Sequence, residues 1–140
     1  MKEKGFSLLE LLIVVAIILI IATIAIPSLL RSRQSAQEAS AVAQLRTFNT
    51  AEVTYISTNG GAYGDIPSLI TQGLLDARFT GSISGYNFTA AVSGNEYTVN
   101  GTAVSVNAGR YDYISGPDYV IRYATEPARA PSGLSGEPVR

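Results

Sequence analysis

The chain has 140 residues and a formal net charge of −1 at pH 7, which suits one small domain with an anchor and gives no electrostatic case for nucleic-acid binding. It contains no histidine and no cysteine, and its two lysines, Lys2 and Lys4, both lie at the N-terminus. These absences remove Ser-His-Asp and Cys-His nucleophiles, Schiff-base chemistry, the P-loop lysine, nearly all zinc sites and any disulfide. We therefore predict that the protein is not an enzyme and holds no cofactor.

An apolar run extends from Phe6 to Ile26 and is interrupted by little except Ser7, Glu10 and Thr23. About twenty apolar residues in a helix span the ~30 Å hydrocarbon core of a bilayer. The run is longer than the hydrophobic region of an ordinary secretory signal, and no A-x-A cleavage site follows it. We therefore expect it to be retained as a membrane anchor.

Glu10 is unusual because it lies inside this apolar run. An ionised side chain near a bilayer centre costs at least ~2.5–3.5 kcal/mol, and no Lys, Arg or His occurs between Lys4 and Arg31 to neutralise it. One interpretation is a protonated or snorkelling carboxylate near the cytoplasmic interface. The other, which we favour, is a carboxylate that awaits a positive partner from another chain.

The segment Gly5-Phe6-Ser7-Leu8-Leu9-Glu10 follows basic residues and precedes an apolar helix with Pro27 near its end. This arrangement resembles the prepilin signature, which type IV pilins share with the pseudopilins of type II secretion. The resemblance implies cleavage between Gly5 and Phe6 and N-methylation of Phe6. It also implies that Glu10 pairs with the terminal amine of a neighbouring subunit in a filament.

The same resemblance implies partners and a location. The partners would be other copies of the chain, a prepilin peptidase and methylase, an inner-membrane assembly platform with its motor ATPase, and the bilayer before assembly. The lysines of the leader favour a cytoplasmic N-terminus, although Arg31 and Arg33 partly balance that bias. The location would be the inner membrane first, and then an extracellular pilus or a periplasmic pseudopilus.

A second helical stretch follows the apolar run. Pro27 predicts a kink or local melting near Thr23–Ile26, and from Ser28 to about Ser57 no Gly or Pro occurs, so the helix totals about fifty residues or roughly 75 Å. One face of this stretch is apolar and should receive a sheet; it comprises Val42, Leu45, Phe48 and Ile56, with Ala41 and Tyr55 beside them. The opposite side is small and polar, and comprises Arg33, Gln37, Ala43 and Arg46.

Glu52 projects from near the middle of this apolar face. We favour a structural carboxylate that accepts hydrogen bonds from backbone N–H groups of the loop after the helix. The alternative is a contact with an arginine of another subunit.

After the helix, turn chemistry and alternation predict a small head. Asn59-Gly60-Gly61 ends the helix, and Pro67–Gly73 is expected to form a short helix. Strand-like runs follow at Gly85–Val92, Glu96–Val106, Arg110–Ser115 and Asp118–Thr125. Asn100-Gly101 is a hairpin signal that would divide the second run. We expect a three- or four-stranded antiparallel meander, followed by an irregular tail from Glu126.

Smaller signals carry less weight. Asp112 and Asp118 flank a glycine-containing turn and are weak candidates for Ca²⁺ ligands, because their spacing is unlike an EF-hand loop. Asn87-Phe88-Thr89 and Asn100-Gly101-Thr102 match the glycosylation triplet, for which chance is the better account.

The predicted fold class is α+β and pilin-like, with a long N-terminal helix and a small antiparallel sheet packed on it. The divisions are a leader (1–5), a transmembrane and assembly helix (6–30), its amphipathic continuation (31–58), a head (59–125) and the tail (126–140). The predicted function is a structural subunit of a type IV pilus. The alternatives are a type II secretion pseudopilin and, remotely, a single-pass anchored periplasmic binding domain. The missing cysteines and tryptophan leave the subtype open.

Overall fold

A computed structural model describes residues 1, 5–123 and 136–139. The chain forms two compact units, Met1–Arg33 and Gln34–Arg140. A single helix, α1 (Leu8–Thr58, 51 residues), contributes its first part to one unit and its second part to the other. The predicted helix of about fifty residues is therefore confirmed. The leader residues 2–4 lie outside the described residues.

Both ends of α1 follow from local sequence. The helix begins after Ser7, and it ends where Gly60 and Gly61 adopt φ values of 67° and 90°, which favour glycine. Pro27 lies inside α1, and the helix is continuous from Thr23 through Pro27, so the predicted local melting is not seen. Proline removes one intrahelical hydrogen bond, and the helix continues on both sides of it.

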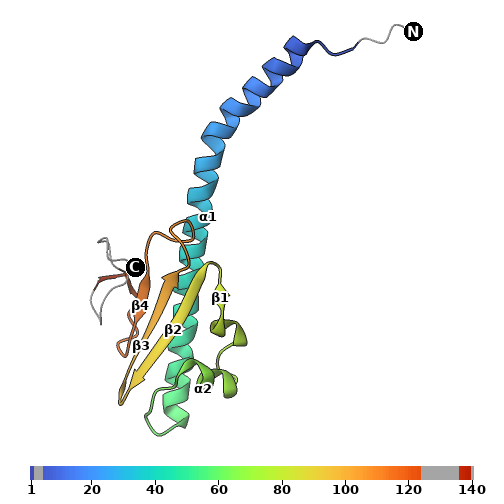
Figure 1. The fold of residues 1–140 in the computed structure, drawn as a ribbon. Coiled ribbons are helices and arrows are strands. Elements are labelled where there is room, and N and C mark those ends of the chain that lie inside the picture. Colours follow the sequence, from blue (N-terminus) through green and yellow to red (C-terminus); the bar gives the residue numbers. More distant parts are fainter. Residues whose placement is uncertain (2–4, 124–135, 140) are drawn as a thin grey trace. The chain divides into compact units, whose positions relative to one another are not determined.

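Among the residues that the structure describes, the head forms one antiparallel sheet of six strands in the sequence order β1 to β6. Figure 1 labels β1 to β4. The strands are β1 (Ser82–Ile83), β2 (Tyr86–Ser93), β3 (Glu96–Ala103), β4 (Tyr113–Ser115), β5 (Arg122–Tyr123) and β6 (Glu137–Pro138). A short helix, α2 (Ile66–Thr71), and a 3-10 turn, η1 (Ala77–Thr80), connect α1 to the sheet. The α+β pilin-like fold class and the short second helix are thus confirmed.

The expected number of three or four strands was wrong. The two additional strands, β1 and β6, have two residues each, too short to give an alternating pattern. The strand β6 pairs with β5 and lies within the tail that we expected to be irregular, of which residues 126–135 and 140 lie outside the described residues. The last two predicted runs also begin later than expected, at Tyr113 and Arg122, and residues 124 and 125 of the final run lie outside the described residues.

The Asn100-Gly101 hairpin was also wrong, because β3 passes through both residues. Asn100 pairs with Thr89 and Gly101 with Phe88. A Cβ added to Gly101 would lie 3.2 Å from Cε1 of Phe88. Glycine is therefore used here to admit an aromatic ring and not to form a turn.

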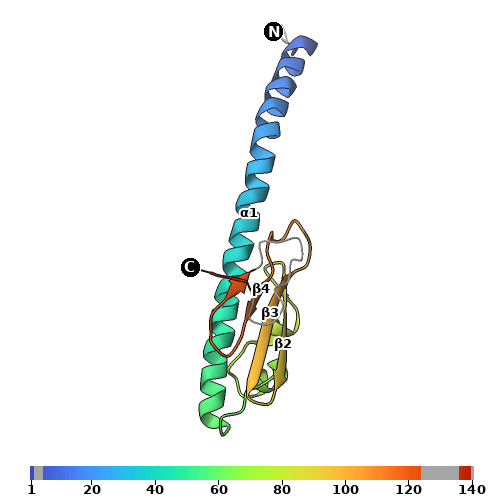
Figure 2. The same ribbon diagram turned by 90° about the vertical axis from the view of Figure 1, so that its left-hand side faces the viewer.

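The core lies between the second part of α1 and the sheet (Figures 1 and 2). The predicted apolar face of α1 is confirmed, since Ala41, Val42, Leu45 and Phe48 are buried. Its partners in the core are mainly aromatic and β-branched residues of β2 and β3, namely Tyr86, Phe88, Tyr97 and Val99. Gln37, which we expected on the opposite face, is half-buried instead and contacts the turn before β2.

Candidate assembly site

The start of α1 is built as a capping box around Ser7 and Glu10. The carboxylate Oε2 of Glu10 accepts a hydrogen bond from the backbone N–H of Ser7 at 2.9 Å, and Oγ of Ser7 accepts one from the N–H of Leu9 at 3.3 Å. This reciprocal arrangement satisfies N–H groups that lack intrahelical partners. Our sequence analysis missed it, although Ser-x-x-Glu before an apolar run is its signature. Oε1 of Glu10 has no protein partner among the described residues.

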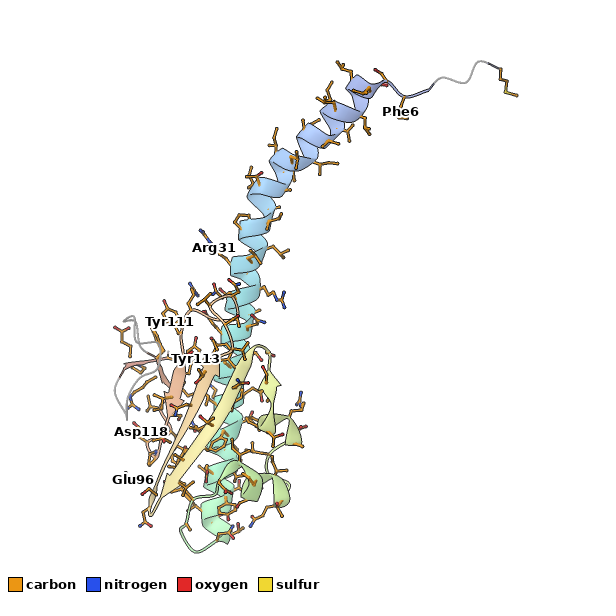
Figure 3. The ribbon with its side chains drawn as sticks, in the orientation of Figure 1. Phe6, Arg31, Glu96, Tyr111, Tyr113 and Asp118 are labelled. Atoms are coloured by element: carbon orange, nitrogen blue, oxygen red, sulfur yellow. The ribbon has the colours of Figure 1, made fainter. Side chains whose placement is uncertain are left out.

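Gly5 and Phe6 precede the helix as exposed chain (Figure 3), with the Phe6 side chain 90% exposed. A peptide bond outside regular structure is accessible to a protease in a way that a helical bond is not. Cleavage there would place a new amine one residue before the capping box.

The first part of α1 exposes an almost continuous apolar surface. Its best 18-residue window has a mean hydropathy of 3.1, and none of that window is buried. The described residues therefore contain one helix that is long and apolar enough to cross a membrane. Exposed large apolar side chains in this segment are Leu8, Leu9, Leu11, Leu12, Ile13, Val14, Val15, Ile17, Ile18, Leu19, Ile20, Ile21, Ile24, Ile26, Leu29 and Leu30.

A partly buried ion pair joins the second part of α1 to the loop before β4. Oε1 of Glu38 accepts hydrogen bonds from the backbone N–H of Arg110 at 2.6 Å and from its Nε at 3.1 Å, while Oε2 accepts one from Nη2 at 2.8 Å. Burial alone would raise the pKa of Glu38, but the hydrogen bonds and charge of Arg110 outweigh it, so the pKa is lowered. No local pattern in the sequence indicates this pair, because its members are 72 residues apart.

A second polar contact, at Asn49, connects α1 to the loop after β4. Its Oδ1 accepts hydrogen bonds from Oη of Tyr97 at 2.9 Å and from Oγ of Ser115 at 3.0 Å, and its Nδ2 donates to the carbonyl of Tyr119 at 3.3 Å. Tyr119 has a φ of 58°, which is uncommon for a residue other than glycine. Asn49 thus holds a strained loop residue in place. Sequence reasoning missed this residue.

Glu52 is fully buried, and its Oε2 accepts a hydrogen bond from the backbone N–H of Gly64 at 3.1 Å. The favoured interpretation, a carboxylate bonded to the loop after the helix, is confirmed. Its Oε1 has no partner among the described residues. Burial raises the pKa of Glu52, the hydrogen bond from Gly64 opposes that rise, and the charge of Asp65 adds to it.

The two weak metal candidates are engaged with other groups. Asp112 accepts a hydrogen bond from the N–H of Ala103 at 2.9 Å, and Asp118 forms an ion pair with Arg122. The hydrogen bond with Arg122 lowers the pKa of Asp118. Among the described residues, no group of three or more His, Cys, Asp or Glu side chains is placed to hold a metal ion.

Comparison with known proteins agrees with these features. Residues 1–26 match the family model described as the prokaryotic N-terminal methylation motif. The chain is 39% identical over 73 residues to the type IV wide pilus major component PilA4 of Thermus thermophilus, across 52% of this chain and 56% of that protein. It is 36% identical over 90 residues to the type IV major pilin protein PilA of Myxococcus xanthus, across 64% of this chain and 39% of that protein.

The chain thus matches about half or less of the length of these relatives. The chain thus combines an N-terminal methylation motif, an exposed apolar helix that is long enough to cross a membrane, and a sheet packed on the continuation of that helix, which is a pilin-like arrangement. The resemblance to type IV pilins is therefore confirmed. Both relatives are pilins, and neither is described as an enzyme.

Proposed function

We propose that this chain is a structural subunit of a type IV pilus, cut after Gly5, methylated at Phe6 and assembled through α1. The observation that carries the proposal is the exposed apolar surface of the first part of α1. At the start of this surface, within the methylation motif, the carboxylate of Glu10 caps the helix. Its function is mechanical and not catalytic. The names of both relatives support a pilus over a secretion pseudopilus.

The apolar surface has two successive environments in this proposal. Before assembly, the bilayer covers it, because about twenty apolar residues match the hydrocarbon thickness. After assembly, neighbouring copies cover it, since side chains that remain 47–80% exposed in the isolated chain require apolar partners once they leave lipid. Transfer between two apolar environments costs little, so the extraction motor works mainly against the charged and polar groups.

Glu10 sets the register of neighbouring copies. Its Oε2 is bonded to Ser7 of its own chain, while Oε1 remains available for the cleaved amine of Phe6 from a neighbour. A carboxylate and an amine that are both buried among apolar helices are costly unless each finds the other. A shift of one helical turn would separate them by about 5.4 Å, so the pair disfavours incorrect registers.

The proposal also implies the rest of the pathway. A prepilin peptidase cuts and methylates the chain, and an inner-membrane platform with a motor ATPase assembles it. The chain is first anchored in the inner membrane with its N-terminus in the cytoplasm. The exposed, non-helical Gly5-Phe6 bond supports the first step.

Intact mass measurement and N-terminal sequencing test the processing. Sheared surface material should contain a chain that begins at methylated Phe6. The same terminus found only in membranes would indicate a pseudopilin or minor subunit. An uncut N-terminus at Met1 would contradict the proposal and favour the anchored binding domain.

Substitution of Glu10 tests the register. We expect Glu10→Ala to leave the head folded and the precursor processed while the filament yield collapses. Ser7→Ala is the matched control, because it removes the helix cap, at a cost of about 1 kcal/mol, and keeps the carboxylate. A filament yield from Glu10→Ala that is no lower than the yield from Ser7→Ala would contradict a role of Glu10 in the register.

A further inference from the structure

Few large apolar side chains of the second unit are exposed, and two of them lie close together in the sequence, directly after β3. In the described part of that unit the exposed ones are Val53, Val92, Val104, Val106 and Tyr119. Val104 and Val106, here called the valine knob, follow β3 and are 52% and 70% exposed. The knob is held firmly, since the N–H of Val104 donates to the carbonyl of Gly85 at 3.0 Å and Nε2 of Gln34 donates to that of Val106 at 2.8 Å.

Two others, Val53 and Tyr119, line an open hollow of about 260 Å³. The hollow lies between α1 and the loop after β4, and its remaining lining residues are Arg46, Asn49 and Thr50. Tyr119 is displayed there by a strained backbone, which Asn49 and a hydrogen bond to the carbonyl of Gly116 at 2.8 Å hold in place. Strain maintained by a buried amide indicates a surface shaped for a contact.

The knob and the hollow lie at opposite ends of the head. Gln34 and Asn49 are 15 residues apart on α1, which corresponds to about 22 Å. The rings of Tyr97 and Tyr119 are 6.3 Å apart, and the seven residues from Tyr97 to Val104 along β3 correspond to about 23 Å. In Figure 3 the labelled Tyr111 lies before β4 and Asp118 lies after it, toward opposite ends of the sheet. One chain therefore cannot fill its own hollow.

We propose that the valine knob of one copy inserts into the hollow of another copy in the filament. This inference rests on the proposed function and identifies the contact between heads. Two different patches of the same chain form a heterologous interface, which propagates into an open helical assembly instead of closing into a dimer. Parallel copies joined in this way are offset by about 22–23 Å along α1.

The chemistry of the two patches is complementary. The valines meet the aliphatic Val53 and the ring of Tyr119, whereas the charged residue of the lining is Arg46. No residue from 104 to 109 is charged, and the next residue, Arg110, is paired with Glu38 of its own chain. Arg46 has no ion-pair partner among the described residues and is free to bond to carbonyl groups of the incoming loop.

Cysteine cross-linking tests the contact, because the chain has no cysteine of its own. We expect filaments of the double variant Val106→Cys/Thr50→Cys to give, after oxidation, a ladder of three or more linked subunits. The single variants should give no ladder. Val106→Cys/Asn87→Cys is the matched control, because Asn87 is exposed on β2 away from the hollow, and it should give none either. Filaments of the first double variant that remain unlinked overturn the inference while the proposed function stands.

If the cysteine double variant does not assemble, two single variants that place opposite charges at residue 106 test the same contact. Val106→Lys brings a cation to Arg46 and should lower filament yield at least about tenfold relative to Val106→Glu, which brings an anion to the same place. Equal yields from the two variants overturn the inference. Absence of filaments from the unsubstituted chain overturns the proposed function itself.

Discussion

Removal of the Glu38 carboxylate should destabilise the head much more than removal of the arginine that it binds. Glu38→Ala deletes three hydrogen bonds and leaves the backbone N–H of Arg110 without its acceptor at the junction of α1 and the loop. An orphaned donor in this part-buried position costs about 1–2 kcal/mol, and the two bonds from the guanidinium add less, because the Arg110 side chain is 55% exposed. We expect a loss of about 2–3 kcal/mol in the free energy of unfolding.

Arg110→Ala is the matched comparison. It removes the two guanidinium bonds but keeps the backbone N–H that donates to Glu38. Since the lost guanidinium is 55% exposed and Glu38 keeps the hydrogen bond from the backbone N–H, we expect a cost of about 1 kcal/mol. The double variant should then cost little more than Glu38→Ala alone.

The pH dependence of these variants provides an independent check. The pKa of Glu38 lies below its usual value of 4.5 in the folded chain, so the folded state releases this proton more readily than the unfolded state. The stability that Glu38 contributes is present above pH 4.5 and is lost as the pH falls through the lowered pKa. The difference between the unsubstituted chain and Glu38→Ala should shrink correspondingly.

Denaturant unfolding of the full chain in detergent, followed by the near-ultraviolet circular dichroism of the tyrosines, measures these differences. The tyrosines all lie after residue 54, so the signal reports on the head and not on the apolar part of α1. If Arg110→Ala were as destabilising as Glu38→Ala, the backbone N–H of Arg110 could not account for most of the stability that Glu38 provides, and the reasoning would be refuted.

Two further substitutions follow from buried groups in the head. Glu52→Gln should raise the free energy of unfolding at pH 7 but not below pH 4.5. The pKa of Glu52 is raised in the folded chain, so the stability that protonated Glu52 contributes is fully present below pH 4.5 and is lost as the pH rises through the folded pKa. Thermal unfolding at the two pH values measures this, and a constant difference would contradict it. Gly109→Ala should prevent stable folding, since the added Cβ would lie within 3.0 Å of three side-chain atoms of the fully buried Tyr86. A Gly81→Ala variant is the control for loss of glycine alone, because its φ is −126° and its Cβ would meet only the carbonyl oxygen of Arg78 at 3.8 Å, and proteolysis of the two variants should differ sharply.

Much of the site near the N-terminus was predictable because its signals are local. The motif from Gly5 to Glu10 and the apolar run are properties of adjacent residues, and no distant contact is needed to read them. The capping role of Glu10 was also predictable from the sequence, because Ser-x-x-Glu before an apolar run is the pattern of a capping box. The metal candidate Asp112 illustrates the opposite case, since only the fold shows that it accepts a hydrogen bond from the N–H of Ala103 at the end of β3.

The sequence by itself determined the helix and the face that it buries. A run of nearly fifty residues with one interior proline favours one long helix, and the spacing of Val42, Leu45 and Phe48 selects the side that receives the sheet. Both are short-range properties, because a helix repeats every 3.6 residues and its hydrogen bonds span four.

Only the tertiary structure decided how the head is completed. The two-residue strands β1 and β6 exist because a neighbouring strand offers unpaired backbone groups, which no alternation within two residues records. Likewise, Glu38 binds Arg110 and Asn49 holds Tyr119 across about 70 residues of chain. Such pairings are chosen by packing in three dimensions, where the free energy of satisfying a buried polar group depends on which distant residue the fold brings to it.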